Sequence, residues 1–293
     1  MTTLEGERRA SASVPALKTW RIVPGRAEID PAGHARSTRW QRRFLGFLTP
    51  IVLIALWEIA YRAGWIDARF FPGPSRIVQA AGDMIASGQW ASDLGVTLRT
   101  ILIGGGGGFL AGALAGTLLA SFRRLRWALE PTLGAFYTIP KLALLPLMLL
   151  IFGLGQLPSL LLVGLGIFFI SWLTVLEAVL EIPGGYLEAA ESFGVGGLRL
   201  VRHVVLPAIM PALFVGLRIS IGQAVLIVIT VEYLIGTKGI GFRIWHSWSL
   251  FAADQMYVGI VTVALLGFLL QAIVRFVGAK VAPWSSGNAA RDK

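Results

Sequence analysis

The stretch Glu188–Pro207 reads EAAESFGVGGLRLVRHVVLP and lies between two long apolar segments. Its first part, Leu187 to Phe193, is rich in residues that favour helices, and Gly194 suits the left-handed conformation that ends a helix. A second apolar rhythm runs from Leu198 to Val205, directly before Leu206 and Pro207. The sequence therefore predicts two short helices joined at Gly194, in a polar loop that docks another protein.

The composition around this loop is that of a membrane protein. Of the 293 residues, 55% are apolar and only 14% are charged, and the mean hydropathy is +0.71. A helix needs about 20 mostly apolar residues to cross a bilayer. Six segments meet that test, so we expect an all-α integral membrane protein with six transmembrane helices. The segments are Phe44–Tyr61, Leu94–Ala120, Leu133–Phe152, Ser159–Leu180, Ala212–Ile235 and Met256–Val277.

Four regions follow from this reading. Residues 1–43 are rich in Arg, Pro, Ser and Ala without helical periodicity, which is typical of a mostly disordered tail. Residues 44–93 comprise the first transmembrane helix and an outer segment. Residues 94–280 form the main transmembrane domain and include the loop region 184–207. Residues 281–293 form a C-terminal tail.

The distribution of Lys and Arg predicts the orientation. Seventeen of these residues fall in the segments on the side of the N-terminus, which include the docking loop, and five fall on the other side. Cytoplasmic loops carry the excess of basic residues. We therefore expect both termini and the loop in the cytoplasm.

Several other functions find no support in the sequence. The net charge of +10 comes largely from this bias and the basic tail, and no nucleic-acid recognition motif accompanies it. The segment Gly236–Gly239, GTKG, lacks the spacing of a phosphate-binding P-loop. Gly106–Ala111 fits a dinucleotide-binding signature in letters, but that signature needs a preceding strand. The absence of Cys and the separation of the three His residues predict no metal site.

Glycines recur at every fourth position of the second apolar segment. On one helix, such residues form a smooth face that a neighbouring backbone can approach closely. The sequence therefore predicts a helix-packing face. Its members are Gly104, Gly108, Gly112 and Gly116.

Three ionisable residues lie within the apolar segments, where such residues often mark a path for ions or solutes, so they are candidates for lining a path of that kind. Lys141 lies beside Pro140, where proline removes a backbone donor and predicts a kink. A charge at that depth is costly unless it is solvated or paired, so Lys141 either faces the path and attracts an anion or has a structural partner. Arg218 either lines the inner end of the path or reaches toward the cytoplasm. Glu232 contributes to a gate or pairs with Lys238.

Two further pairs are expected at the outer side. Glu58 and Arg62 have the spacing of a helical ion pair. Trp245 and Trp248 fit an interfacial aromatic anchor, with docking of an extracytoplasmic protein as the second interpretation.

The loop resembles the EAA motif of the membrane subunits of ABC importers. That motif is Glu-Ala-Ala, three residues, Gly, nine residues and then Ile-x-Leu-Pro; Val204 replaces the Ile here. The matching residues are Glu188, Ala189, Ala190, Gly194, Leu206 and Pro207. Over residues 70–280, further segments are similar to permeases of the nitrate, sulfonate, taurine and bicarbonate group. They are Phe71-Pro72-Gly73-Pro74-Ser75, Thr138-Ile139-Pro140-Lys141, Leu144-Leu145-Pro146, Phe152-Gly153 and Gly216-Leu217-Arg218.

This resemblance implies a type I importer fold in which the loop forms cytoplasmic coupling helices. It implies two ATPase subunits that hold ATP and Mg, a second permease copy that makes a homodimer, and an extracytoplasmic solute-binding protein. No cofactor is then expected on this chain, which would be a transport subunit and not an enzyme. The alternative from the residues alone is a secondary transporter or channel driven by an ion gradient, which would need ionisable groups in its path.

Overall fold

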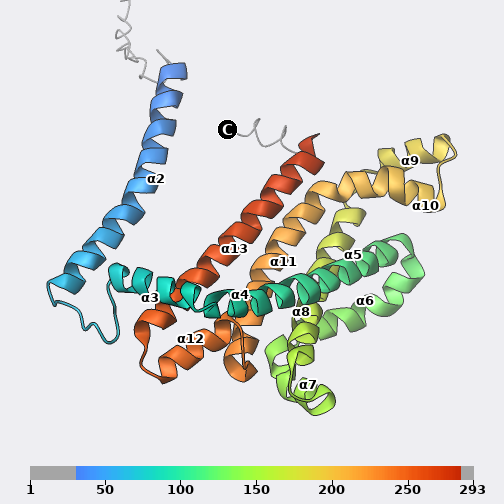
Figure 1. Cartoon of the computed structure of the whole chain (residues 1–293). Coiled ribbons are helices and arrows are strands. Elements are labelled where there is room, and N and C mark those ends of the chain that lie inside the picture. Colours follow the sequence, from blue (N-terminus) through green and yellow to red (C-terminus); the bar gives the residue numbers. More distant parts are fainter. Residues whose placement is uncertain (1–30, 285–293) are drawn as a thin grey trace, which may run out of the picture. The chain divides into compact units, whose positions relative to one another are not determined.

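The computed structural model describes residues 31–284, and all regular structure in that range is helical (Figure 1). The chain divides between Leu56 and Trp57 into two units. The first 30 residues of the predicted tail lie outside the described residues, as do residues 285–293.

The first unit contains most of α2 (Pro31–Arg62). This helix begins at Pro31 and not at Phe44, so residues 31–43 of the predicted tail are helical. Proline is well suited to the first position of a helix because its missing N–H needs no partner there. From that start, the helix continues into the apolar segment that meets the length and hydropathy of a membrane span.

The second unit is a set of helices connected by short turns (Figure 1). Its helices are α3 (Pro74–Ala86), α4 (Gln89–Thr100), α5 (Gly106–Ser121), α6 (Arg123–Thr138), α7 (Leu145–Phe152), α8 (Gln156–Leu180), α9 (Gly184–Ser192), α10 (Gly197–Leu200), α11 (Leu206–Ile235), α12 (Ile240–Ser249) and α13 (Ala253–Val281). π-Helical turns at Ile101–Gly105 and Val201–Val205 join α4 to α5 and α10 to α11. A 3₁₀ turn, Lys141–Leu144, precedes α7.

Five helical stretches in the described chain are long and apolar enough to cross a membrane. They are Phe44–Arg62, Gln89–Ser121, Gln156–Leu180, Gly197–Ile235 and Ala253–Val281. The fifth predicted span was placed at Ala212–Ile235, but its helix starts at Gly197 because α10 runs into α11 without a break. Pro207 follows directly after the π-helical turn Val201–Val205, so its missing backbone N–H falls where the helix changes its hydrogen-bond spacing.

The third predicted span, Leu133–Phe152, is not one helix. The chain bends by 87° between α6 and the Lys141–Phe152 stretch. Ile139 and Pro140 are extended, with ψ angles of 127° and 114°. Proline excludes the helical conformation from the residue before it, which explains why the helix ends here. The predicted break at Pro140 is confirmed, whereas Pro146 begins α7 and kinks nothing.

The core of the second unit is built on the contact between α5 and α8. Gly104, Gly108, Gly112 and Gly116 lie along this contact. A Cβ atom at Gly108 would lie 2.2 Å from the carbonyl oxygen of Gly164, and one at Gly112 would lie 2.3 Å from that of Phe168. The two backbones therefore touch, as small residues permit in membrane helices.

Candidate coupling loop and membrane-buried polar residues

The loop Glu188–Pro207 forms a helical hairpin at one end of the second unit. Helix α9 ends at Ser192, and Gly194 has a φ of +69°. The amide of Val195 donates to the carbonyl of Ala190, which closes the turn. Gly197, with a φ of +59°, then begins α10. A left-handed glycine at a helix end is the expected cap, because a side chain there would be strained.

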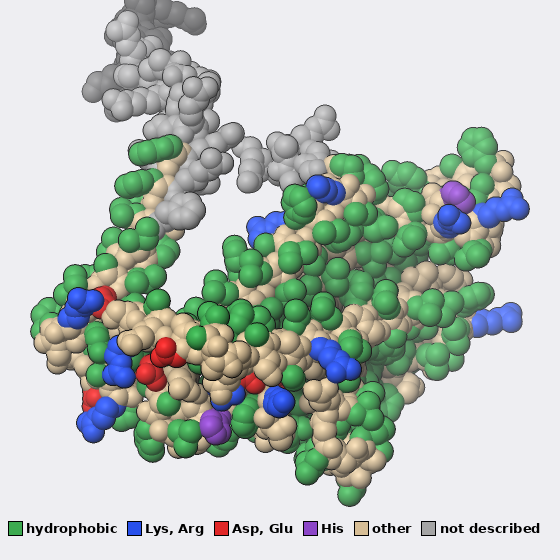
Figure 2. All heavy atoms as spheres, in the orientation of Figure 1, with side chains coloured by type: hydrophobic (Ala, Val, Ile, Leu, Met, Phe, Trp, Pro, Cys, Tyr) green, Lys and Arg blue, Asp and Glu red, His purple; other side chains and the backbone are tan. Residues whose placement is uncertain are grey.

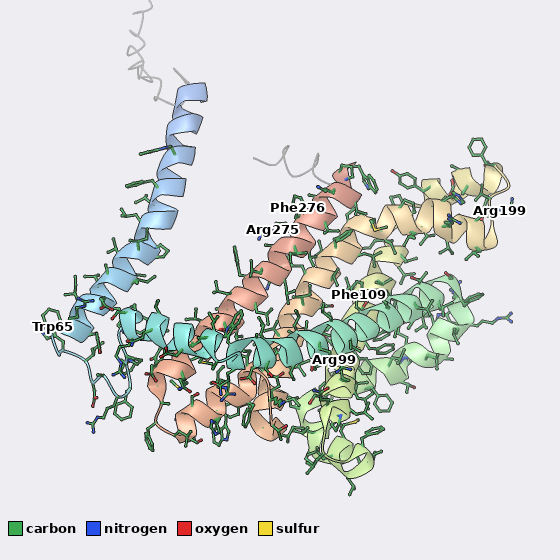
Figure 3. All side chains as sticks on the ribbon, viewed as in Figure 1. Trp65, Arg99, Phe109, Arg199, Arg275 and Phe276 are labelled. Atoms are coloured by element: carbon green, nitrogen blue, oxygen red, sulfur yellow. The ribbon has the colours of Figure 1, made fainter. Side chains whose placement is uncertain are left out.

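The tip of this hairpin exposes large apolar side chains. Phe193 is 85% exposed and Leu198 is 83% exposed. Charged residues surround them on the same two short helices, namely Glu188, Glu191 and Arg199. Figure 3 shows Arg199 at the end that projects away from the long helices. Exposed apolar groups with a charged rim have the composition of a protein-protein contact.

Buried residues anchor the hairpin to the long helices. Ala190 and Val205 are buried, and Val205 packs with Val175 of α8 and Ile209 of α11. A hollow of about 1140 Å³ lies between α9, the base of α11 and Trp284 beyond α13. The hairpin and the end of α13 thus share one end of the unit, as Figure 1 also shows. Of the predicted loop residues, Ala190 is the buried one, whereas Glu188, Ala189 and Gly194 are exposed.

Lys141 lies at the bend between α6 and α7, and its ammonium group contacts three backbone carbonyls. They belong to Phe136, Tyr137 and Ile139, the last at 2.9 Å. The same group lies 4.9 Å from the ring centre of Phe169. The last carbonyls of a helix lack partners within the helix and carry partial negative charge. The structure therefore supports the second of the two interpretations, in which Lys141 has a structural partner.

Glu232 is buried near the end of α11 that is opposite the hairpin, and it does not pair with Lys238 in the described part of the chain. Its carboxylate accepts hydrogen bonds from the Thr97 hydroxyl and from the Gly241 amide, both at 2.9 Å. Gly239 lies so close that a Cβ atom there would be 2.4 Å from the Glu232 carboxyl carbon. These hydrogen bonds connect the start of α12 to α4 and α11.

A buried ion pair next to Glu232 was not anticipated from the sequence. Asp93 of α4 accepts a hydrogen bond from Arg243 of α12 at 2.8 Å and another from the Gly239 amide at 3.0 Å. The Asp93 side chain is 3% exposed and that of Arg243 is 12% exposed. The spacing of Asp93 and Thr97 on one face of α4 is a local signal of a polar helix face. Nothing local indicates its partner on α12.

The other ionisable positions lie at least partly at the surface: Arg218 is exposed, and the Glu58 side chain is 20% exposed. Arg218 lines a groove between α11 and α13 together with Arg275. Glu58 forms the expected ion pair with Arg62 at 2.6 Å and also accepts hydrogen bonds from Ser75. Trp245 and Trp248 stack with ring centres 4.6 Å apart. The structure therefore brings Glu232 close to Asp93, while Lys141 and Arg218 belong to separate sites.

The distribution of side chains in Figure 2 matches a membrane-embedded body. On this face, hydrophobic side chains cover the long helices, whereas charged ones gather near α3, α4 and α12 at one end and at the α9–α10 hairpin at the other. An apolar band between two polar ends, with close-packed glycine-rich helices inside, is the arrangement of a multi-pass membrane protein.

Sequence comparison places this chain in a family. Residues 108–283 match the family described as "Binding-protein-dependent transport system inner membrane component". Because the match covers more than half of the chain, the chain belongs to this family of ABC importer permeases. It is therefore a transport component.

Two relatives are named as permease proteins for the transport of aliphatic sulfonates and of taurine. The chain is 30% identical over 235 residues to the putative aliphatic sulfonates transport permease protein SsuC of Escherichia coli (strain K12), covering 79% of this chain and 88% of that protein. It is 27% identical over 267 residues to the taurine transport system permease protein TauC of the same organism, covering 87% and 97%.

A solved structure shares the fold. It is the bacterial alginate ABC transporter in complex with an alginate pentasaccharide-bound periplasmic protein. One of its chains superposes with a TM-score of 0.60 at 15% identity, over 87% of this chain and 96% of that one. This likeness supports the importer permease fold.

Proposed function

We propose that this chain is the membrane-spanning subunit of an ATP-driven importer for a small anionic solute of the sulfonate or taurine type. The α9–α10 hairpin couples it to ATPase subunits on other chains, which hold ATP and Mg. A second copy completes the path, and an extracytoplasmic binding protein delivers the solute. The excess of basic residues on the hairpin side supports a cytoplasmic hairpin.

The exposed tip of the hairpin carries this proposal. Phe193 lies in the turn after α9 and Leu198 lies in α10, and the described residues leave both side chains almost fully exposed. Burying such side chains in a partner contributes about 1.5–3 kcal/mol each. Val205 packs against Val175 of α8 and Ile209 of α11, so a displacement of the hairpin is transmitted to these membrane helices.

The solute class rests on the two named relatives. SsuC and TauC are named for aliphatic sulfonates and taurine, and both align over most of this chain. The Trp245–Trp248 stack lies at the end opposite the hairpin, where a binding protein would dock.

The test replaces the two tip residues and measures assembly and transport. Phe193→Ser with Leu198→Ser should release the co-expressed ATPase during purification and abolish ATP-dependent uptake of taurine in proteoliposomes. Since both side chains are exposed, the permease itself should still insert and fold. Leu154→Ser is the matched control, because Leu154 is 87% exposed in the turn before α8.

Two results would contradict the proposal. Normal assembly and coupled uptake by the Phe193/Leu198 variant would show that the hairpin tip is not the docking site. Uptake that collapses on addition of an ionophore, with ATP held constant, would instead favour a transporter driven by an ion gradient.

A further inference from the structure

Two neighbouring pockets between α11 and α13 share the side chain of Val274. One is an apolar cavity and the other is a groove that holds two arginines. Their chemistry is complementary to a molecule with a hydrocarbon part and an acidic part.

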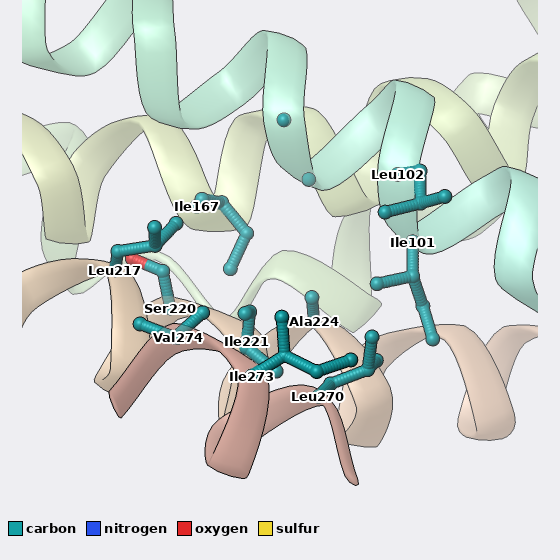
Figure 4. Close-up of a pocket in the computed structure, with 12 residues that line it drawn as sticks. Ile101, Leu102, Ile167, Leu217, Ser220, Ile221, Ala224, Leu270, Ile273 and Val274 are labelled. Carbon is teal, nitrogen blue, oxygen red and sulfur yellow. The ribbon is translucent and has the colours of Figure 1, made fainter. Parts of the chain in front are cut away.

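The apolar cavity has a volume of about 250 Å³ and is lined by residues of the Ile101–Gly105 turn, α5, α8, α11 and α13 (Figure 4). Ile167 and Leu270 are among its walls, and each lies near the middle of its long apolar helix. At its rim, Leu102 is 57% exposed and Ile273 is 56% exposed. An apolar cavity of about 150 Å³ is enough to bind benzene, so this one has room for part of a hydrocarbon chain.

The groove lies nearer the hairpin end of the unit. Arg218 of α11 and Arg275 of α13 line it together with Phe214 and Val274, and its volume is about 150 Å³. Neither guanidinium forms an ion pair or a side-chain hydrogen bond with any of residues 31–284. Two exposed arginines in one groove favour an anionic ligand, because guanidinium groups match phosphate oxygens in geometry and charge.

The depth of the two pockets matches that of a lipid. Arg275 lies six residues before the end of α13 at Val281, which corresponds to about 9 Å along the helix. Basic side chains at this depth reach the headgroup level, and basic pockets between membrane helices bind anionic headgroups. The apolar cavity is deeper, near the middle of the spans.

We propose that these two pockets form a binding site for one anionic phospholipid. Its phosphate contacts Arg218 and Arg275, and one of its acyl chains enters the cavity through the gap between Leu102 and Ile273. The bound lipid then fills the space between α11 and α13 at the hairpin end of the membrane.

The cavity does not suit the anionic solute of the proposed function. Its one polar side chain is that of Ser220, whose hydroxyl has no hydrogen-bond partner. A sulfonate that entered the cavity would lose its water without gaining sufficient donors, and this costs several kcal/mol. A hydrocarbon chain has no hydrogen bonds with water to lose, so its burial in the cavity carries no such cost.

The test measures lipid retention by the purified full-length permease in its assembled importer. Native mass spectrometry with added phosphatidylglycerol or phosphatidylcholine should show preferential retention of phosphatidylglycerol. A basic residue that contacts an anionic headgroup contributes about 1 kcal/mol to lipid binding, so Arg218→Gln with Arg275→Gln should weaken retention about thirty-fold. Ile273→Trp should also weaken it by closing the rim.

Lys280→Gln is the control, because Lys280 is an exposed cation on α13 outside both pockets and should leave retention unchanged. Equal retention of the two lipids, or undiminished phosphatidylglycerol binding by the double arginine variant, would overturn the proposal. Displacement of the lipid by hexanesulfonate would also overturn it and assign the pockets to the solute. Lipid retention is measured without ATP, so it can fail or succeed independently of the importer assignment.

Discussion

The contact between α5 and α8 gives a prediction in which two adjacent glycines respond oppositely to the same substitution. A Cβ atom at Gly108 would lie 2.2 Å from the carbonyl oxygen of Gly164, whereas one at Gly107 would meet no atom within 4 Å. Gly108→Ala should therefore destabilise the protein, and Gly107→Ala should not.

The magnitude follows from the geometry. Ordinary contact begins near 3.4 Å, so the backbones of α5 and α8 would have to part by about 1 Å at Gly108. A gap of that size removes a quarter to a half of the dispersion attraction along the contact. Overpacking of this kind costs about 1–3 kcal/mol. At Gly107, alanine instead gains up to about 1 kcal/mol of helix propensity.

The assay is reversible unfolding of the purified permease in mixed detergent micelles, followed by circular dichroism. We expect the free energies of unfolding of the two variants to differ by about 2 kcal/mol or more, with Gly107→Ala at or above the unsubstituted protein. Indistinguishable unfolding curves for the two variants would refute the close approach of α5 to α8.

Three further predictions concern the polar sites. Asp93→Asn leaves the nearly buried Arg243 without its counter-charge, so the free energy of unfolding should fall by about 3 kcal/mol; a fall below about 0.5 kcal/mol would argue against the ion pair. Gly239 has a φ of +111°, and a Cβ atom there would lie 2.4 Å from the carboxyl carbon of Glu232. Gly239→Ala should therefore loosen the start of α12 and speed amide exchange there; unchanged exchange would contradict this contact. Lys141→Met removes the hydrogen-bond donor of three carbonyls, so the free energy of unfolding should fall by about 2 kcal/mol in the same assay. An unaltered unfolding curve would instead favour the interpretation that Lys141 faces the translocation path.

The sequence by itself determined the features that depend on local pattern. The apolar segments predicted the long helices, because spanning a bilayer requires a minimum length of apolar residues. Gly194 predicted the end of α9, because few other residues adopt a positive φ at low cost. The residue before Pro140 predicted a break for a similarly local steric reason.

Only the tertiary structure decided which distant residues meet. The pairing of Asp93 with Arg243 joins positions 150 residues apart, and no periodicity within α4 or α12 specifies it. The 87° angle at the bend depends on how α7 packs against α8, whereas the proline excludes only the continuous helix. Charges within membrane segments are costly wherever they lie, so sequence identifies them as significant. Their partners, and hence whether they serve structure or transport, depend on the packing of helices that are remote in the chain.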